Sequence, residues 1–158
     1  AVTISNILLL ITAAALTGGL FYSWSVSVMP GFARLPDKEF VAAMRAANRA
    51  IQNPVFFAAF SGTLILLPTS AFLHYGQSTR FWLLVTASVF YLVGVFGVTI
   101  FGNVPLNNAL ERFVPESATD EETALHRANF ENRWNRLNNV RAVFSTLAII
   151  FIVIACLN

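Results

Sequence analysis

The chain has 158 residues, of which 56% are hydrophobic and only 11% are charged, whereas charged residues make up about 25% of an ordinary soluble domain. A soluble fold of this length could not bury so much apolar surface, so the composition excludes a soluble globular domain. The formal net charge is +2. The arginines fall in two segments and do not form the basic stripe that tracks phosphates, so no nucleic-acid partner is expected.

Four charge-poor stretches follow one another along the chain, each near or above the roughly 17–25 residues that a membrane-spanning helix needs. We place the spans at about residues 4–28, 55–75, 81–101 and 141–157. Lipid cannot hydrogen-bond to backbone groups, so these segments are expected to be helical. The sequence therefore predicts an all-α fold, an integral membrane four-helix bundle that forms a single transmembrane domain over residues 1–158.

The first stretch, residues 1–33, has no basic start and is longer than the apolar core of a signal peptide. We therefore expect a retained helix from which the initiator methionine has been removed. Small residues within the spans are expected to let helices approach closely. They are Ala14, Ala15, Gly18, Gly19, Gly94 and Gly97.

Nearly all ionisable residues lie in two long loops, between spans one and two and between spans three and four. The positive-inside rule predicts that these loops are cytoplasmic and that both termini lie on the opposite side, in a bacterial inner membrane. Each loop is predicted to contain an amphipathic helix. Residues 37–52 form the first, either at the interface or as an inward extension of span two. Thr119 to Glu122 indicates a capping box that opens the second, which runs to Asn139 and into span four.

The spans contain few residues that could carry redox or proton chemistry. No charged residue lies in the middle of a span, which disfavours an exporter built on a membrane-embedded carboxylate. His74 is predicted at the outer end of span two and His126 in an inner loop, so the two cannot jointly bind a haem. Cys156 is the single cysteine, and the ligands of a metal cluster are missing. The sequence therefore predicts neither a metal site nor a cofactor.

Amide, arginine and tryptophan side chains form three groups at the predicted inner face. Within each group the spacing places the side chains on one side of a helix. The groups are Asn103 with Asn107; Trp134 with Asn138 and Arg141; and Arg45 with Asn48 and Gln52. If the loop helices fold back against the bundle, the three groups converge at the mouth of one pocket.

Such a pocket would combine amide and guanidinium donors with an interior rich in phenylalanine. It suits a planar hydrophobic molecule that bears phenol or carbonyl oxygens, and its donors would stabilise a developing oxyanion. The alternative is structural: the asparagines cap helix ends and the arginines contact lipid phosphates. Phe56, Phe57 and Phe60 are expected to be lipid or core contacts.

Three segments carry a resemblance to a known family: Asn-Arg-Ala-Ile-Gln-Asn-Pro at 48–54, Asn-Val-Pro-Leu-Asn-Asn-Ala-Leu at 103–110, and Arg-Trp-Asn-Arg-Leu-Asn-Asn-Val-Arg at 133–141. They resemble a family of small four-helix membrane proteins that includes the anthrone oxygenases of polyketide pathways, and the likeness covers nearly the whole chain. The resemblance implies oxidation of an anthrone to an anthraquinone by molecular oxygen, without a metal or flavin. The substrate is itself the reductant, because loss of its acidic benzylic proton gives an electron-rich anion.

Carried onto this chain, the resemblance implies that Asn103 and Asn107 form one wall of the site. Trp134, Asn138 and Arg141 form the other wall, where Arg141 and the asparagines would stabilise the anion. Many family members have histidine at the position of Asn138. An asparagine side chain cannot act as a base near pH 7, which leaves His126 as the candidate base.

Two other functions stay open. The first is a non-enzymatic membrane module that binds a lipid, a quinone or a partner membrane protein; a homo-oligomer or larger membrane complex is compatible with either reading. The second is transport, supported by a faint internal repeat of the parallel type that some transporters have. Each half of the repeat has a proline near the inner end of a span and then an Asn-Arg pair: Pro30 with Asn48-Arg49, and Pro105 with Asn135-Arg136.

Overall fold

The computed structural model describes residues 2–158, with side chains from residue 6 onward, and every regular element in that range is a helix. Several elements follow one another without a break and form longer continuous helices. The elements are α1 (Val2–Ser23), η1 (Trp24–Val28), α2 (Met29–Phe32), α3 (Asp37–Ala50), α4 (Pro54–Leu73), α5 (Ser78–Tyr91), η2 (Leu92–Gly97), η3 (Thr99–Asn103), α6 (Val104–Arg112) and α7 (Asp120–Leu157).

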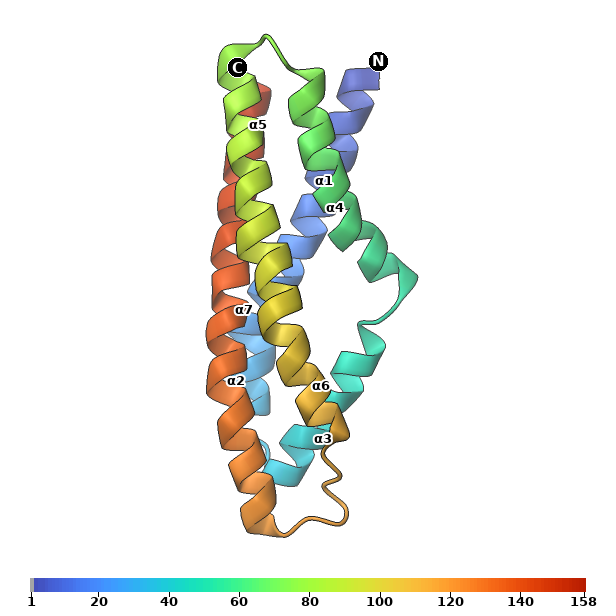
Figure 1. The fold of residues 1–158 in the computed structure, drawn as a ribbon, viewed down its shortest axis with the longest axis vertical. Coiled ribbons are helices and arrows are strands. Elements are labelled where there is room, and N and C mark those ends of the chain that lie inside the picture. The colour runs from blue at the N-terminus through green and yellow to red at the C-terminus, as the bar shows by residue number, and fades with distance from the viewer. Residues whose placement is uncertain (1) are drawn as a thin grey trace.

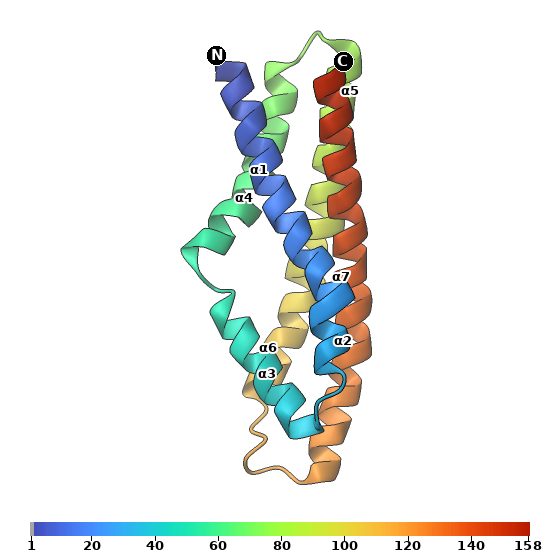
Figure 2. The ribbon, with the colours of Figure 1, turned by 180° about the vertical axis from the view of Figure 1, so that it is seen from behind.

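Four of the resulting helices are long and apolar enough to cross a membrane: Asn6–Phe32, Pro54–Leu73, Ser78–Arg112 and Asp120–Leu157. Figures 1 and 2 show them running side by side, with both chain ends at one end of the bundle and the loop between α6 and α7 at the other. The predicted all-α four-helix membrane bundle is therefore confirmed. The third and fourth helices continue well beyond the predicted spans 81–101 and 141–157.

The helix α7 begins at a well-defined cap. The Thr119 hydroxyl accepts from the Glu122 backbone N–H at 3.1 Å, and the Glu122 carboxylate accepts from the Thr119 N–H at 2.8 Å, which is the predicted capping box. At 1.5 Å per residue, the 38 residues of α7 extend about 57 Å. A bilayer core is about 30 Å thick, so a large part of α7 projects beyond it.

Three π-helical turns interrupt the long helices: η1 in the first, and η2 and η3 in the third. Two of them precede a proline. Pro30 follows η1 and Pro105 follows η3, and a proline ring clashes with the carbonyl four residues before it. That carbonyl belongs to Val26 in one case and Phe101 in the other, so the widened turn lies where the clash would occur. Such turns redirect side chains and are frequent at functional sites.

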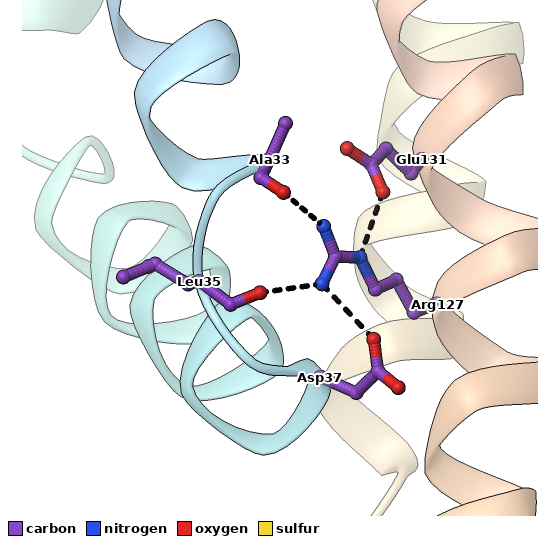
Figure 3. A network of polar contacts seen from close by, with 5 residues as sticks. All are labelled: Ala33, Leu35, Asp37, Arg127 and Glu131. Atoms are coloured by element: carbon purple, nitrogen blue, oxygen red, sulfur yellow. Dashed lines mark hydrogen bonds and ion pairs between the residues drawn. The ribbon is translucent and has the colours of Figure 1, made fainter.

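Polar contacts at the turn between α2 and α3 hold α3 against the bundle. The helix leans outward and meets α4 at a corner (Figure 1), while its other end follows a turn after α2. Arg127 of α7 binds this turn, and its guanidinium also lies 4.4 Å from the ring centre of Phe40. The acceptors around Arg127 are drawn in Figure 3: the carbonyls of Ala33 (2.9 Å) and Leu35 (2.7 Å) and the carboxylates of Asp37 (3.0 Å) and Glu131 (2.8 Å).

Two of the predicted small residues lie at close contacts between helices. A Cβ on Gly94 would come within 2.2 Å of the Phe144 ring, and one on Gly18 within 2.8 Å of Ile149 Cδ1. A Cβ on Gly19 would have no atom within 4 Å beyond the neighbouring backbone of its own helix. Gly94 thus lets η2 pack against α7, whereas Gly19 faces open space.

Gly94→Ala is expected to destabilise the protein by about 1–3 kcal/mol, because Phe144 must leave its position to avoid the new methyl group. Gly19→Ala is the matched control and should be neutral or slightly stabilising, since alanine is the better helix former. Thermal unfolding of both variants in detergent measures the difference. Equal melting temperatures would contradict the close contact at Gly94.

Arg127→Gln is expected to make α3 open locally more often, because the two carbonyls of the α2–α3 turn lose a charged donor. The hydrogen bonds of a charged donor are worth about 2 kcal/mol, which corresponds to roughly 30-fold faster amide exchange in α3. Hydrogen-exchange mass spectrometry over residues 37–50 measures it, with the exposed Arg136→Gln on the same helix as control. Unchanged exchange in Arg127→Gln would show that apolar packing alone holds α3.

Candidate functional site

A cavity of about 240 Å³ lies where α1 and η1, α3, the start of α4, η3 with α6, and α7 come together. Ligand pockets usually measure about 300–1,000 Å³. This cavity lies slightly below that range, so it suits a small molecule. Its lining is mostly aromatic and aliphatic, with a few polar side chains. The aromatic lining residues are Phe21, Trp24, Phe56, Phe57, Phe60 and Trp134, and the polar ones are Asn48, Gln52, Thr99, Asn107, Asn108, Asn138 and Arg141.

The start of α4 places three of the aromatic side chains in the cavity. Asn53 caps this helix, since its side-chain oxygen accepts from the Phe56 N–H at 3.0 Å, and Pro54 supplies a first residue with a helical φ. Phe56 and Phe60 then stack with ring centres 5.2 Å apart. The phenylalanines expected as lipid or core contacts therefore line the cavity as well.

Arg141 places a buried positive charge at the cavity wall, because only 6% of this residue's surface is exposed. The guanidinium donates to the Thr99 hydroxyl at 3.2 Å and to the Asn138 side-chain oxygen at 2.8 Å. It also lies 4.3 Å from the Phe21 ring centre and 5.4 Å from that of Trp134. Its Nε is buried and has no hydrogen-bond partner in the described part of the chain. A buried charge with no ion pair is unfavourable, which makes this arginine a candidate binding group.

Asn138 is held in one orientation by the first helix. Its side-chain N–H₂ donates to the Phe21 carbonyl at 3.1 Å and to the Ser25 hydroxyl at 2.8 Å. The side-chain oxygen is thereby directed to Arg141. Ser25 belongs to the π-helical turn η1, so this turn fixes Asn138, which in turn orients the guanidinium.

Trp134 connects the α7 wall to the α6 wall. Its indole N–H donates to the Asn107 side-chain oxygen at 2.8 Å, and its ring lies 5.3 Å from that of Trp24. Asn103 lies behind this wall: it is 1% exposed and donates to the Trp134 carbonyl at 3.4 Å. Asn103 thus supports the tryptophan from outside the cavity lining.

Six residues of the three groups predicted from the sequence line the cavity together: Asn48, Gln52, Asn107, Trp134, Asn138 and Arg141. Arg45 does not; its Nε lies 3.8 Å from a carboxylate oxygen of Glu111. His126 is exposed, stacks on Phe113 with ring centres 3.9 Å apart, and lines a separate surface hollow. Within residues 2–158, no three His, Cys, Asp or Glu side chains lie together as metal ligands would.

Sequence reasoning missed the contribution of the first helix. Phe21, Trp24 and Ser25 lie in a long apolar stretch without polar contrast, so neither charge nor periodicity marked them. Thr99 was missed for the same reason. The prolines that follow η1 and η3 were the available signal, because each one predicts a local departure from α-helical geometry.

Arg141→Met is expected to leave the melting temperature unchanged or higher, because it removes a buried, unpaired charge and keeps an apolar stem of similar length. Trp134→Ala is the contrasting variant, since loss of a buried tryptophan costs about 3–5 kcal/mol. Differential scanning fluorimetry in detergent compares the two. A larger loss of stability in Arg141→Met would mean that the arginine is mainly a structural group.

A comparison with known families gives one match. The chain matches the anthrone oxygenase family over residues 40–151, which cover most of α3, all of α4, α5 and α6, and most of α7, and with them most of the cavity wall. No curated protein and no solved structure shows a significant match to the chain. Since the match spans more than half of the 158 residues, the chain belongs to the anthrone oxygenase family.

Proposed function

We propose that this protein is a membrane oxygenase that acts without a cofactor on a planar, electron-rich aromatic substrate, an anthrone or a related quinol-like polyketide. The observation that carries the proposal is the buried Arg141 guanidinium, which lines an aromatic cavity and has no carboxylate partner among the described residues. Membership of the anthrone oxygenase family supports the same substrate class.

The reaction balances without any further reactant: one anthrone and one dioxygen give one anthraquinone and one water. The substrate loses its benzylic proton, and the resulting anion passes one electron to dioxygen. The radical and superoxide combine to form a carbon–oxygen bond, and a proton converts the product to a hydroperoxide. Cleavage of the O–O bond with loss of the remaining benzylic hydrogen then gives the carbonyl group and water.

In this scheme the protein binds and orients the anion and keeps bulk water away. Arg141 faces the anionic oxygen, with Thr99 and Asn138 fixing the guanidinium. Asn48 and Asn107 contact the polar edge of the substrate, and the rings of Phe56 and Phe60 stack on its face. His126 lies outside the cavity lining, and the scheme gives it no role.

The mouth of the cavity suits a substrate that arrives from the membrane. Phe57 is 48% and Ile100 40% exposed, and the exposed amides Gln52 and Asn108 line the same opening. Apolar and amide groups side by side match the boundary between lipid chains and headgroups. We propose a bacterial inner membrane, with the α2–α3 turn and the α6–α7 loop on the cytoplasmic side, both termini opposite, and lipid as the surrounding partner.

Oxygen uptake by the purified protein with a hydroxyanthrone tests the proposal. We expect one dioxygen consumed per anthraquinone formed, followed by an oxygen electrode and by the quinone absorbance. Arg141→Gln should lower kcat/KM by about 100-fold or more, the cost of losing one donor to a developing oxyanion. Arg136→Gln, an exposed arginine of the same helix, is the control and should retain activity. A rate equal to that of protein-free buffer would refute the oxygenase.

A second candidate is a binding module that holds a quinone or related aromatic molecule without oxidising it. It is favoured by the position of Asn138, because an amide beside Arg141 cannot accept the substrate proton. Stable binding of an anthraquinone without oxygen uptake would support this function over the oxygenase.

A further inference from the structure

The charged and titratable groups around the cavity show an unusual distribution. Among the lining residues described, Arg141 is the one titratable side chain, and no Asp, Glu, His, Lys, Tyr or Cys lines the cavity. A general base must lie within hydrogen-bond reach of the proton it removes, about 2.6–3.2 Å or one water away. The cavity wall offers no such group.

The elements packed around Arg141 supply no negative charge that would neutralise it. The helix α4 contains no charged residue, and neither do α1 and η1. On the third helix, Tyr91 donates its hydroxyl to the Phe60 carbonyl at 2.7 Å, and Glu111 at the end of α6 is bound by Arg49 and lies near Arg45. On α7, Arg133 and Arg136 are exposed. The acidic residues Asp37 of α3 and Glu131 of α7 are both bound by Arg127, and Glu39 is exposed. Arg141 is therefore the one charge on the described cavity wall.

From this distribution we infer that the cavity binds its aromatic ligand as the oxyanion, phenolate or enolate, and that Arg141 selects the ionised form without any protein side chain removing the proton. The inference rests on the proposed function only for the chemical class of the ligand. It adds that the ligand gives its proton to water at the cavity mouth, where Gln52 and Asn108 are exposed.

Ionisation of the ligand and its binding beside Arg141 are linked equilibria. A positive charge within about 4–6 Å of an acidic group favours its ionised form and lowers its pKa by about 1–3 pH units. Phe21 and Trp134 beside the guanidinium are buried, so the attraction is expected to be stronger there than in bulk water. The anion consequently binds more tightly than the neutral ligand by the same 10- to 1,000-fold factor. Selection of the anion by affinity thus replaces proton abstraction by a base.

A hydroxyanthraquinone dye tests this directly, because its phenol and phenolate absorb at different wavelengths and it is not oxidised further. We expect the dye bound to the wild-type protein in detergent to ionise at a pH about 1–3 units below that of the free dye. In Arg141→Gln the bound dye should ionise as the free dye does. Arg141→Lys, which keeps the charge, should retain a lowered value, and Arg136→Gln should match the wild type.

The possible outcomes separate this inference from the proposed function. Binding of the dye with an unchanged or raised pKa would overturn the inference and leave an aromatic-binding site in place. An equally lowered pKa in Arg141→Gln would overturn the assignment to Arg141. Failure of the dye to bind wild-type protein would overturn the inference and the proposed cavity together. Thermal unfolding of each variant establishes that it is folded, and the Lys and Gln variants at the same position keep the comparison matched.

Discussion

Arg127 connects the turn between α2 and α3 to α7 near the capped start of that helix. The shape of the cavity depends on this contact, because α3 forms one of its walls. Its guanidinium binds backbone carbonyls of the turn together with carboxylates on both sides. The helix α3 then runs from the turn to the corner with α4 and carries Asn48 into the cavity wall. Apolar packing of Phe40 and Met44 supports α3 along its length. Without the Arg127 contacts, this apolar packing alone would hold the wall that α3 forms.

The second constraint is the lipid environment, which requires that backbone groups be satisfied within helices. The protein departs from regular α-helix in the first and third spanning helices, through the turns η1, η2 and η3. Two of these turns supply site residues: Trp24 and Ser25 come from η1, and Thr99 from η3. A widened helical turn thus does in the membrane what a loop does in a soluble enzyme, since it directs polar groups inward without exposing backbone to lipid.

The four-helix fold could be predicted because charge-free stretches of this length have few structural alternatives in a membrane. The capping box could also be predicted, because Thr119 and Glu122 have the residue types and the spacing that it requires. Residues at spacings i, i+4 and i+7, such as Trp134, Asn138 and Arg141, do lie on one wall of the cavity. Periodicity does not say which face of one helix meets another, so Asn103 lies behind the wall and Arg45 faces Glu111. His126 extends from a turn of α7 that packs on Phe113, away from the cavity.

The length of α7 has a consequence for the depth of the site. Arg141 is the last charged residue of α7: the exposed Arg136 and Asn139 precede it, and the apolar run 142–157 follows it. The guanidinium therefore lies at the junction between the polar and the apolar part of this helix, a position that helix tilt and bilayer thickness would affect. In a thinner or thicker bilayer, a vertical displacement of the helix would change how much water reaches the one charge on the described cavity wall.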